Sequence, residues 1–237
     1  MMNWIADERV RVFKKALLKM GWYCEKMFLL SIEAFQTKDE KIARQVIEDD
    51  NVLDEMEIEV RQEATALLGV HQLSGLNLRF VAGGIQIANT FERIGDTTRR
   101  ISEDTLALIR DHSGNSQFSL MRKISQIAAS ILKESLRVLA DLNVEGAIEV
   151  CARDAEVDEL FDEIRCELTE NMAKNAENIR KLFLMLDIAQ SIEEIADLST
   201  NIVESTIYIV KSQAYKCLRD EMKPFKGTGG VLFEDSD

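Results

Sequence analysis

Apolar residues recur at three- and four-residue spacing along most of the chain, which is the period of an amphipathic α-helix. Six long helices are predicted, at about residues 5–35, from the "TKDE" stretch to 68, from the "GVHQLSGLN" stretch to 111, and at about 117–141, 144–175 and 177–217. No stretch alternates with the period of two that indicates strands joined by a hairpin turn. The pattern therefore predicts an all-α protein.

The residues between these segments indicate how the helices begin and end. Thr37 and Glu40 in "TKDE" predict a capping box, in which Thr37 caps the second helix and Glu40 reaches back. The polar run "HSGNSQ" at 112–117 predicts a loop, and Asn143 is a candidate N-cap for the fifth helix. Pro224, followed by "GTGG", is expected to end the regular structure.

The two halves of the chain match each other. "SIEAFQTKDEKIARQVIEDD" at 31–50 aligns without gaps to "SLRVLADLNVEGAIEVCARD" at 135–154. "FERIGDTTRRI" at 91–101 aligns to "IEEIADLSTNI" at 192–202. The offset is 104 residues in the first block and 101 in the second, so a short deletion in a helix-to-helix turn explains the change. The chain is therefore expected to be a duplicated unit.

Each unit holds three of the predicted helices. Because short loops make neighbouring helices antiparallel, two tandem three-helix bundles are expected. The first would occupy residues 1–112 and the second residues 116–217, with a flexible acidic tail at 218–237.

Charge and cysteine content narrow the function. The net charge of −13, with 42 acids against 29 Lys and Arg, argues against sequence-independent nucleic-acid binding and suits cations or a basic partner. The four cysteines form no CxxC pair, so we expect reduced thiols in a cytosolic protein. The N-terminus lacks the apolar run of a signal peptide, and the longest apolar runs are too short to span a bilayer.

Acids spaced four residues apart recur at equivalent places in the two halves. The pairs are Asp50/Asp54 and Glu92/Asp96 in the first half, and Asp154/Asp158 and Glu193/Asp197 in the second. Helical spacing puts Glu92 in line with Ile85 and Ala88, on the side that otherwise predicts core. Because the second and third helices of each unit should be antiparallel neighbours, its two acid pairs could face each other.

Four converging carboxylates repel one another, and a bound cation removes that penalty. Ligands that are all carboxylates suit hard ions such as magnesium, manganese, calcium or iron. The only histidines, His71 and His112, have no acid three residues before them, so the Glu-x-x-His motif of di-iron bundles is absent. No catalytic constellation is present, and we expect no enzyme. Acids are so frequent here that a solvated helix face remains the alternative interpretation.

With its duplication, its DxxxD motifs and its "ERIGD", the sequence resembles the PhoU family of phosphate-uptake regulators over about residues 5–215. The resemblance implies two three-helix bundles, each with a multinuclear cluster of divalent or trivalent metal ions such as iron, manganese or magnesium. Carried over by position, the ligands of one cluster would be Asp50, Asp54, Glu92 and Asp96. Those of the other would be Asp154, Asp158, Glu193 and Asp197.

The resemblance also implies a role. Such a protein would be a cytoplasmic, non-enzymatic regulator that links a phosphate ABC transporter to the sensor histidine kinase of the phosphate regulon. It would repress the phosphate-starvation response and phosphate uptake. Such proteins are often homodimers, and this one would reach the membrane only through its partners. The rival hypothesis is a structural helical interaction protein that binds no metal.

The sequence departs from the family pattern at a few positions. Asn77 stands where Asp is usual, and Glu194 and Ala196 replace Arg and Gly in the second motif. Arg100 stands where the second half has Asn201. None of these departures removes an expected ligand.

Overall fold

The computed structural model of the chain describes residues 2–111, 119–174, 176–218 and 221–225. The loop predicted at 112–117 and the last twelve residues of the predicted tail, 226–237, lie outside the described residues.

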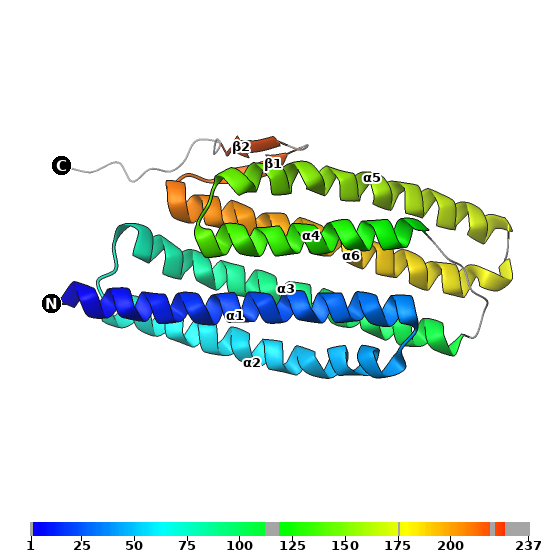
Figure 1. Cartoon of the computed structure of the whole chain (residues 1–237), viewed down its shortest axis with the longest axis horizontal. Coiled ribbons are helices and arrows are strands. Elements are labelled where there is room, and N and C mark those ends of the chain that lie inside the picture. The colour runs from blue at the N-terminus through cyan, green and yellow to red at the C-terminus, as the bar shows by residue number, and fades with distance from the viewer. Residues whose placement is uncertain (1, 112–118, 175, 219–220, 226–237) are drawn as a thin grey trace, which may run out of the picture.

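Six long helices account for nearly all of the described chain, which confirms the predicted all-α architecture (Figure 1). The helices are α1 (Met2–Thr37), α2 (Glu40–Val70), α3 (Gly75–Arg110), α4 (Ser119–Asp141), α5 (Glu145–Lys174) and α6 (Ile179–Lys211). A short 3-10 helix, Ala176–Asn178, precedes α6. Two short strands follow it, β1 (Tyr215–Leu218) and β2 (Glu221–Pro224).

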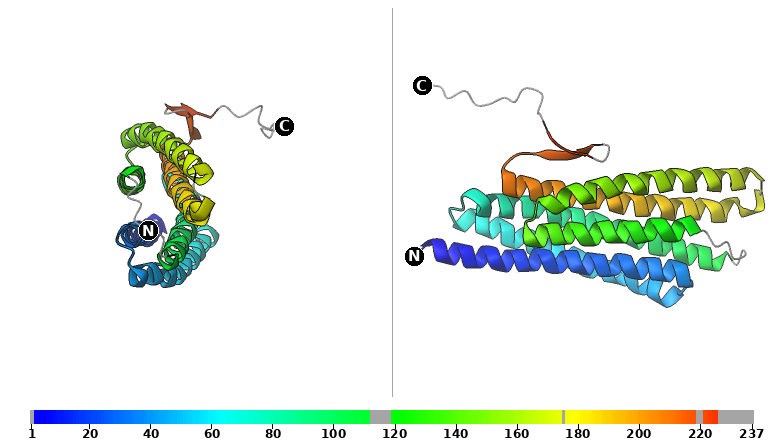
Figure 2. Two further views of the ribbon diagram at one scale, coloured as in Figure 1. Left: turned by 90° about the vertical axis from the view of Figure 1, so that its right-hand side faces the viewer. Right: turned by 45° about the horizontal axis from the view of Figure 1, so that its top comes forward.

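The helices form two layers of three that lie side by side with nearly parallel axes (Figures 1 and 2). In the first repeat α3 packs against α1 and α2, and in the second repeat α6 packs against α4 and α5. The repeats meet through α3 against α6 and through α1 against α4. One continuous cluster of buried apolar side chains runs through both repeats, from Phe13 to Ile209. The duplicated units therefore share a single core.

The turns between helices are set by local hydrogen bonds. Asp39 caps α2, because its Oδ1 accepts from the backbone N–H groups of Lys41 (2.8 Å) and Ile42 (3.2 Å). The expectation that Thr37 fills this role was wrong, since its hydroxyl donates to the Glu33 carbonyl inside the last turn of α1 (2.7 Å). At the start of α5, Asn143 Oδ1 accepts from the Glu145 N–H (3.0 Å), as predicted.

The segment after α6 differs from the prediction of a helix to residue 217. The helix ends at Lys211, and Ser212 adopts a left-handed conformation with φ 61°. The chain then forms an antiparallel hairpin in which Tyr215 pairs with Pro224. Buried Glu204 of α6 anchors the hairpin by accepting from the Cys217 N–H (2.8 Å) and from Lys216 Nζ. Tertiary contacts, not a local alternation of polar and apolar residues, stabilise these strands.

The cysteine prediction was wrong for two of the four residues. Cys151 of α5 and Cys217 of β1 form a disulfide, while Cys24 is a buried free thiol and Cys166 an exposed one. The hairpin folds back along α5 and brings Cys217 beside Cys151. The two residues are 66 positions apart, and their spacing gives no sign of the pairing.

Within the described ranges, none of the helices has both the length and the apolar character that crossing a bilayer requires.

Candidate metal centre

The first pair of acid motifs meets where α2 packs against α3. Asp50 is only 6% exposed, whereas Asp54 one turn later is exposed. Glu92 and Asp96 of α3 are partly buried. The pKa of Glu92 is raised by burial and then by the charges of Asp96 and Asp54, and Asp50 contributes as well. The structure therefore brings the four predicted residues within electrostatic reach of one another.

Burial is the largest influence on the pKa of Asp50. It raises the pKa of this carboxyl to about 6, an effect that Arg99 opposes and that Asp54 and Asp96 reinforce. Gly95 makes the burial possible, because a Cβ there would lie 2.3 Å from Leu53 Cδ2 and 3.3 Å from Asp50 Oδ1. A glycine at this position therefore lets α3 approach α2 closely at the acids.

An arginine supplies the counter-charge of the first cluster. Arg99 Nε lies 3.1 Å from Asp50 Oδ2, and Arg99 Nη2 lies 2.9 Å from Asp96 Oδ1. The guanidinium thus joins one acid of α2 to one acid of α3, as a bound cation would. Arg99 follows Asp96 by one helical turn, a spacing at which an arginine commonly pairs with an acid, whereas its contact with Asp50 depends on the packing of α3 against α2.

A fifth carboxylate belongs to this cluster and was missed from the sequence. Glu57 lies two turns after Asp50 on α2 and is 7% exposed. Its Oε2 lies 3.6 Å from Arg61 Nη2, and its buried Oε1 has no hydrogen-bond partner within the described residues. Glu57 also raises the pKa of Glu92. Its heptad spacing from Asp50 places it on the same face of α2, which could have identified it.

The second pair of motifs lies between α5 and α6. The pKa of Glu193 is raised to about 7, first by burial and then by the charges of Asp158, Asp197 and Glu194. Asp158 and Asp197 are exposed, and Asp154, one turn before Asp158, is partly buried. The groups that set the pKa of Glu193 are all acids, so positive charge is in shorter supply here than around Asp50.

The two clusters differ at the position of the arginine. By the alignment of the halves, Thr200 stands in the second half where Arg99 stands in the first. The Thr200 hydroxyl donates to the Asp197 carbonyl at 2.7 Å and brings no charge. Phe161 likewise stands where the first half has Glu57. The first cluster therefore has a resident cation at this position and an acid at position 57, while the second has a neutral residue at each of the two matching positions.

Both clusters have the donor chemistry that hard cations prefer, since every predicted ligand is a carboxylate. As the side chains are placed, no three His, Cys, Asp or Glu residues in the described part of the chain come close enough together to hold one ion. Three of the acids carry raised pKa values, first because burial disfavours the charged carboxylate and then because neighbouring acids repel it. The residues are therefore of the type that binds a hard cation, and binding one would require their side chains to turn toward it.

Glu194, a departure from the family pattern in the second motif, connects the two repeats. Glu194 of α6 accepts ion pairs from two arginines of α3: its Oε1 lies 3.9 Å from Arg93 Nη2, and its Oε2 lies 3.4 Å from Arg100 Nη1. An arginine at position 194 would face Arg93 and Arg100 with like charge. The reversal of charge between the halves therefore serves the contact of α3 with α6.

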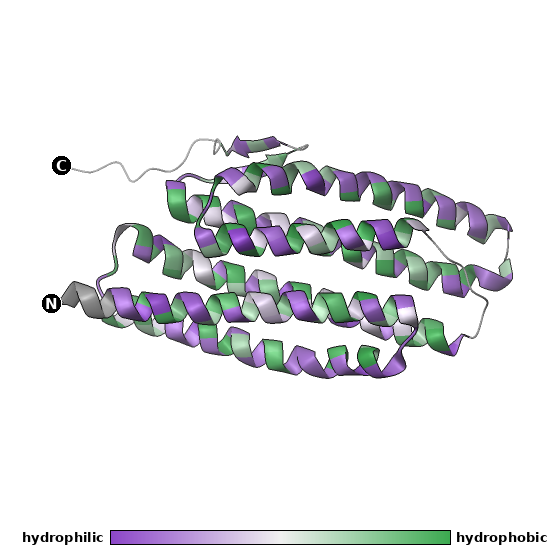
Figure 3. Cartoon of the chain, viewed as in Figure 1, coloured by the Kyte–Doolittle hydropathy of each residue, from purple (hydrophilic) through white to green (hydrophobic). Residues whose placement is uncertain are grey.

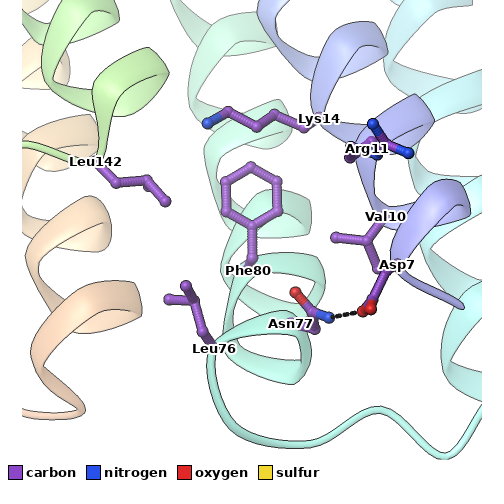
Figure 4. A pocket seen from close by; sticks show the side chains of 8 residues that line it. All are labelled: Asp7, Val10, Arg11, Lys14, Leu76, Asn77, Phe80 and Leu142. Atoms are coloured by element: carbon purple, nitrogen blue, oxygen red, sulfur yellow. Dashed lines mark hydrogen bonds between the residues drawn. The ribbon is translucent and has the colours of Figure 1, made fainter. Parts of the chain in front are cut away.

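A pocket of about 230 Å³ lies apart from both clusters, at the end of the molecule that holds the start of α1 and of α3 (Figure 4). Its apolar lining comes from Val10 of α1, Leu76 and Phe80 of α3, and Leu142 of the α4–α5 turn. Asn77 Nδ2 donates to Asp7 Oδ1 at 2.7 Å, across the pocket rim. An aspartate at position 77 would repel Asp7, which explains why Asn stands there.

Comparison with known families decides the identity of the fold. The model of the PhoU domain matches residues 17–105 and again residues 121–206, which is most of the chain and one match per repeat. The chain belongs to the PhoU family. The repeat found in the sequence is therefore the PhoU domain itself, and the family resemblance stated from the acid motifs is confirmed.

Relatives cover nearly the whole chain. It is 41% identical over 236 residues to the phosphate-specific transport system accessory protein PhoU homolog 2 of Thermotoga maritima, with 100% of both chains covered. It is 30% identical over 198 residues to the PhoU homolog of Clostridium acetobutylicum, covering 82% of this chain and 89% of that one. These relatives are accessory proteins and not enzymes, in agreement with the prediction.

Solved structures show the same fold. PhoU of Pseudomonas aeruginosa superposes with a TM-score of 0.84 at 24% identity, covering 87% of this chain and 99% of that one. The phosphate transport system regulatory protein PhoU of Streptococcus pneumoniae superposes with a TM-score of 0.81 at 19% identity, covering 89% and 99%. The six-helix PhoU architecture is thus shared at low sequence identity.

Proposed function

We propose that this PhoU-family protein is a cytoplasmic accessory protein of a phosphate-specific transport system. It links a phosphate ABC transporter to a sensor histidine kinase and holds the phosphate-starvation response and phosphate uptake down when phosphate is plentiful. The proposal is supported by the two PhoU-domain matches and by full-length similarity to accessory proteins of phosphate transport.

Metal binding is the chemical part of this proposal. One site would use Asp50, Asp54, Glu92 and Asp96, and the other Asp154, Asp158, Glu193 and Asp197. The single observation that supports it is the set of raised pKa values at the α2–α3 and α5–α6 contacts, where buried carboxylates stand together. When bound, iron, manganese or magnesium would supply positive charge and would cross-link two helices of one repeat.

The alternative function is a helical interaction protein that binds no metal, and Arg99 is the observation that favours it. In the first repeat this arginine already bridges Asp50 and Asp96, so that cluster holds one positive charge without an ion. The second repeat lacks the bridge. We therefore expect the second site to fill first as metal is added.

Metal content separates the two functions. We expect mass spectrometry of untagged, freshly purified protein to find several equivalents of iron, manganese or magnesium. Glu92→Ala with Asp96→Ala should lose metal from the first half while the second half stays loaded and folded. The matched control is Glu55→Ala with Glu59→Ala, a pair of exposed acids at the same spacing on α2. Equal metal loss in both variants, or no metal even after incubation with these ions, would favour the alternative.

The regulatory role has its own test. Deleting the gene should derepress phosphate-starvation genes in phosphate-rich medium, measured as transcript levels against the parent strain. Normal repression in the deletion strain would remove the proposed link to the kinase. Homodimer formation, which the family resemblance suggests, is measured separately by light scattering of the purified protein.

A further inference from the structure

Charge is divided between two sides of this acidic molecule. α1 has six Lys and Arg against four Asp and Glu, and α4 has four against two. By contrast, α2 has nine acids against three bases, and α5 has ten against three. A chain with a net charge of −13 thus presents two helices that are net positive.

These two helices lie next to each other. α1 and α4 pack together, and Lys14 Nζ of α1 donates to the Ala140 carbonyl of α4 at 2.7 Å. The end-on view in Figure 2 places them on one side of the molecule, with α2 and α5 at its two ends and α3 and α6 behind. The first helices of both repeats therefore form one elongated surface.

The solvent side of this surface is basic and carries large apolar side chains. Exposed residues recur at helical spacing, and we name them the α1–α4 face: Val12, Lys15, Lys19, Trp22, Lys26 and Leu29 of α1, with Arg122, Lys133 and Arg137 of α4. Trp22 is 54% exposed and Leu29 is 49% exposed. Figure 3, which views this side, shows hydrophobic residues spaced among hydrophilic ones along α1.

Most basic groups of this face have no acid to pair with. Within the described residues, Lys15, Lys19 and Lys133 take part in no ion pair, while Arg137 pairs with Glu134 of its own helix. The charge of the face is therefore available to a partner.

We propose that the α1–α4 face binds directly to the surface of an anionic lipid bilayer. Tryptophan partitions to the membrane interface, and lysines extend their stems over apolar surface while the ammonium groups contact lipid phosphates. The face is long and follows the outer side of two antiparallel helices, so its charges suit a broad plane better than a compact acidic site. The same plane repels α2 and α5, which orients the molecule with its acid clusters away from the lipid.

This inference goes beyond the proposed function, because it requires neither bound metal nor a transporter. The family resemblance implies that the protein reaches the membrane only through its partners, whereas the α1–α4 face would contact lipid directly. Purified protein and vesicles alone can therefore test it, and failure here leaves the metal and repression experiments untouched.

The test is flotation of the full-length protein with phosphatidylcholine vesicles, with or without 30 mol% phosphatidylglycerol, at low and high salt. The test variant is Lys15→Glu with Lys19→Glu. The control is Lys41→Glu with Lys174→Glu, which changes the net charge equally through exposed lysines of the acidic helices α2 and α5. Circular dichroism of each variant verifies that the helices remain folded.

Each basic residue near an anionic surface is worth roughly a factor of five in binding. We expect wild type and control to float with anionic vesicles at low salt, and the test variant to bind at least tenfold more weakly. In a Trp4→Phe background, Trp22 fluorescence should shift to the blue on binding, because the indole leaves water. Equal binding of the two double variants would overturn the proposal. Absence of vesicle binding by wild type would also overturn it, and capture of an acidic protein would then assign the face to a protein partner.

Discussion

Arg99 is the residue at which the two proposed metal sites of this PhoU-family protein differ most. In the first repeat its guanidinium pairs with Asp50 and Asp96, and in the second repeat Thr200 stands in its place. A metal ion that binds the first cluster must therefore displace a charge already present. The bond from Arg99 Nη2 to Asp96 is a charge-assisted hydrogen bond, and such a bond contributes about 1.5–3 kcal/mol, so this competition is substantial.

We expect Arg99→Thr, which copies the second repeat, to increase the affinity of the first site for Mn²⁺ by about tenfold or more. Isothermal titration calorimetry in the Glu193→Gln background, which disables the second site, measures it. Arg110→Thr is the control, because that arginine is exposed on the same helix. An unchanged first-site affinity in Arg99→Thr would show that the guanidinium does not occupy the metal position.

Asp104 of α3 lies outside the predicted sites, and its ionisation makes the stability of the fold depend on pH. Burial and the charges of Asp187 and Glu103 raise its pKa to about 6, against the opposing effect of Arg100. Since the folded-state pKa exceeds the ordinary value of 3.8, the folded chain holds this proton more tightly than the unfolded chain. Ionising Asp104 therefore costs stability, and the cost grows as pH rises from about 4 through about 6.

Asp104→Asn cannot ionise, so the variant should melt at a higher temperature than wild type at pH 8, with the difference shrinking toward pH 4. Melting curves at pH 4, 6 and 8 measure this dependence. Glu167→Gln is the control, because Glu167 is an exposed acid of α5 that is not among the groups that shift the pKa of Asp104. A pH-independent difference for Asp104→Asn would mean that the substitution acts through packing.

The contact of α2 with α3 is the element-scale feature that buries Asp50. Gly95 has no room for a side chain, because a Cβ would lie 2.3 Å from Leu53 Cδ2. The second repeat has Ala196 at the matching position, so α5 and α6 pack there with a methyl group between them.

We expect Gly95→Ala to lower the free energy of unfolding by about 1–3 kcal/mol, the usual cost of overpacking. Urea denaturation gives the value. Gly69→Ala is the control, since nothing lies within 4 Å of a Cβ at that position of α2, and it should stabilise the helix by about 0.5–1 kcal/mol. If both variants lose stability equally, the close approach of α2 and α3 does not explain why a glycine occupies position 95.

At the scale of the whole molecule, the two PhoU domains fold around one core. α3 and α6 pack against each other along the contact between the repeats, and Glu194 pairs there with Arg93 and Arg100. A metal ion that stabilises either repeat should therefore stabilise the whole chain.

This coupling predicts the response to metal. A ligand that binds the native state at 100 times its dissociation constant adds about 2.7 kcal/mol per site, which raises the melting temperature of a chain of this size by several degrees. Melting curves recorded after chelation and after addition of Mn²⁺ should show one transition that moves upward. The Glu193→Ala/Asp197→Ala variant should retain only part of the shift. An unchanged curve in wild type would contradict metal binding.

The sequence alone determined the helices, the duplication and the acid pairs, because each is encoded by residues close together in the chain or by direct alignment of two segments. Helical periodicity places Asp50 and Glu92 on the core side of their helices. The Asn143 cap likewise acts within the first turn of α5. These features need no knowledge of what packs against the helix.

Tertiary structure decided the rest, because it depends on which helices meet. The Cys151–Cys217 disulfide and the hairpin exist only because the chain after α6 returns along α5. Arg99 becomes a counter-charge only when α3 lies against α2, and Glu194 a link between repeats only when α6 lies against α3. Distances between side chains on different helices arise from packing, and no periodicity within one helix contains them.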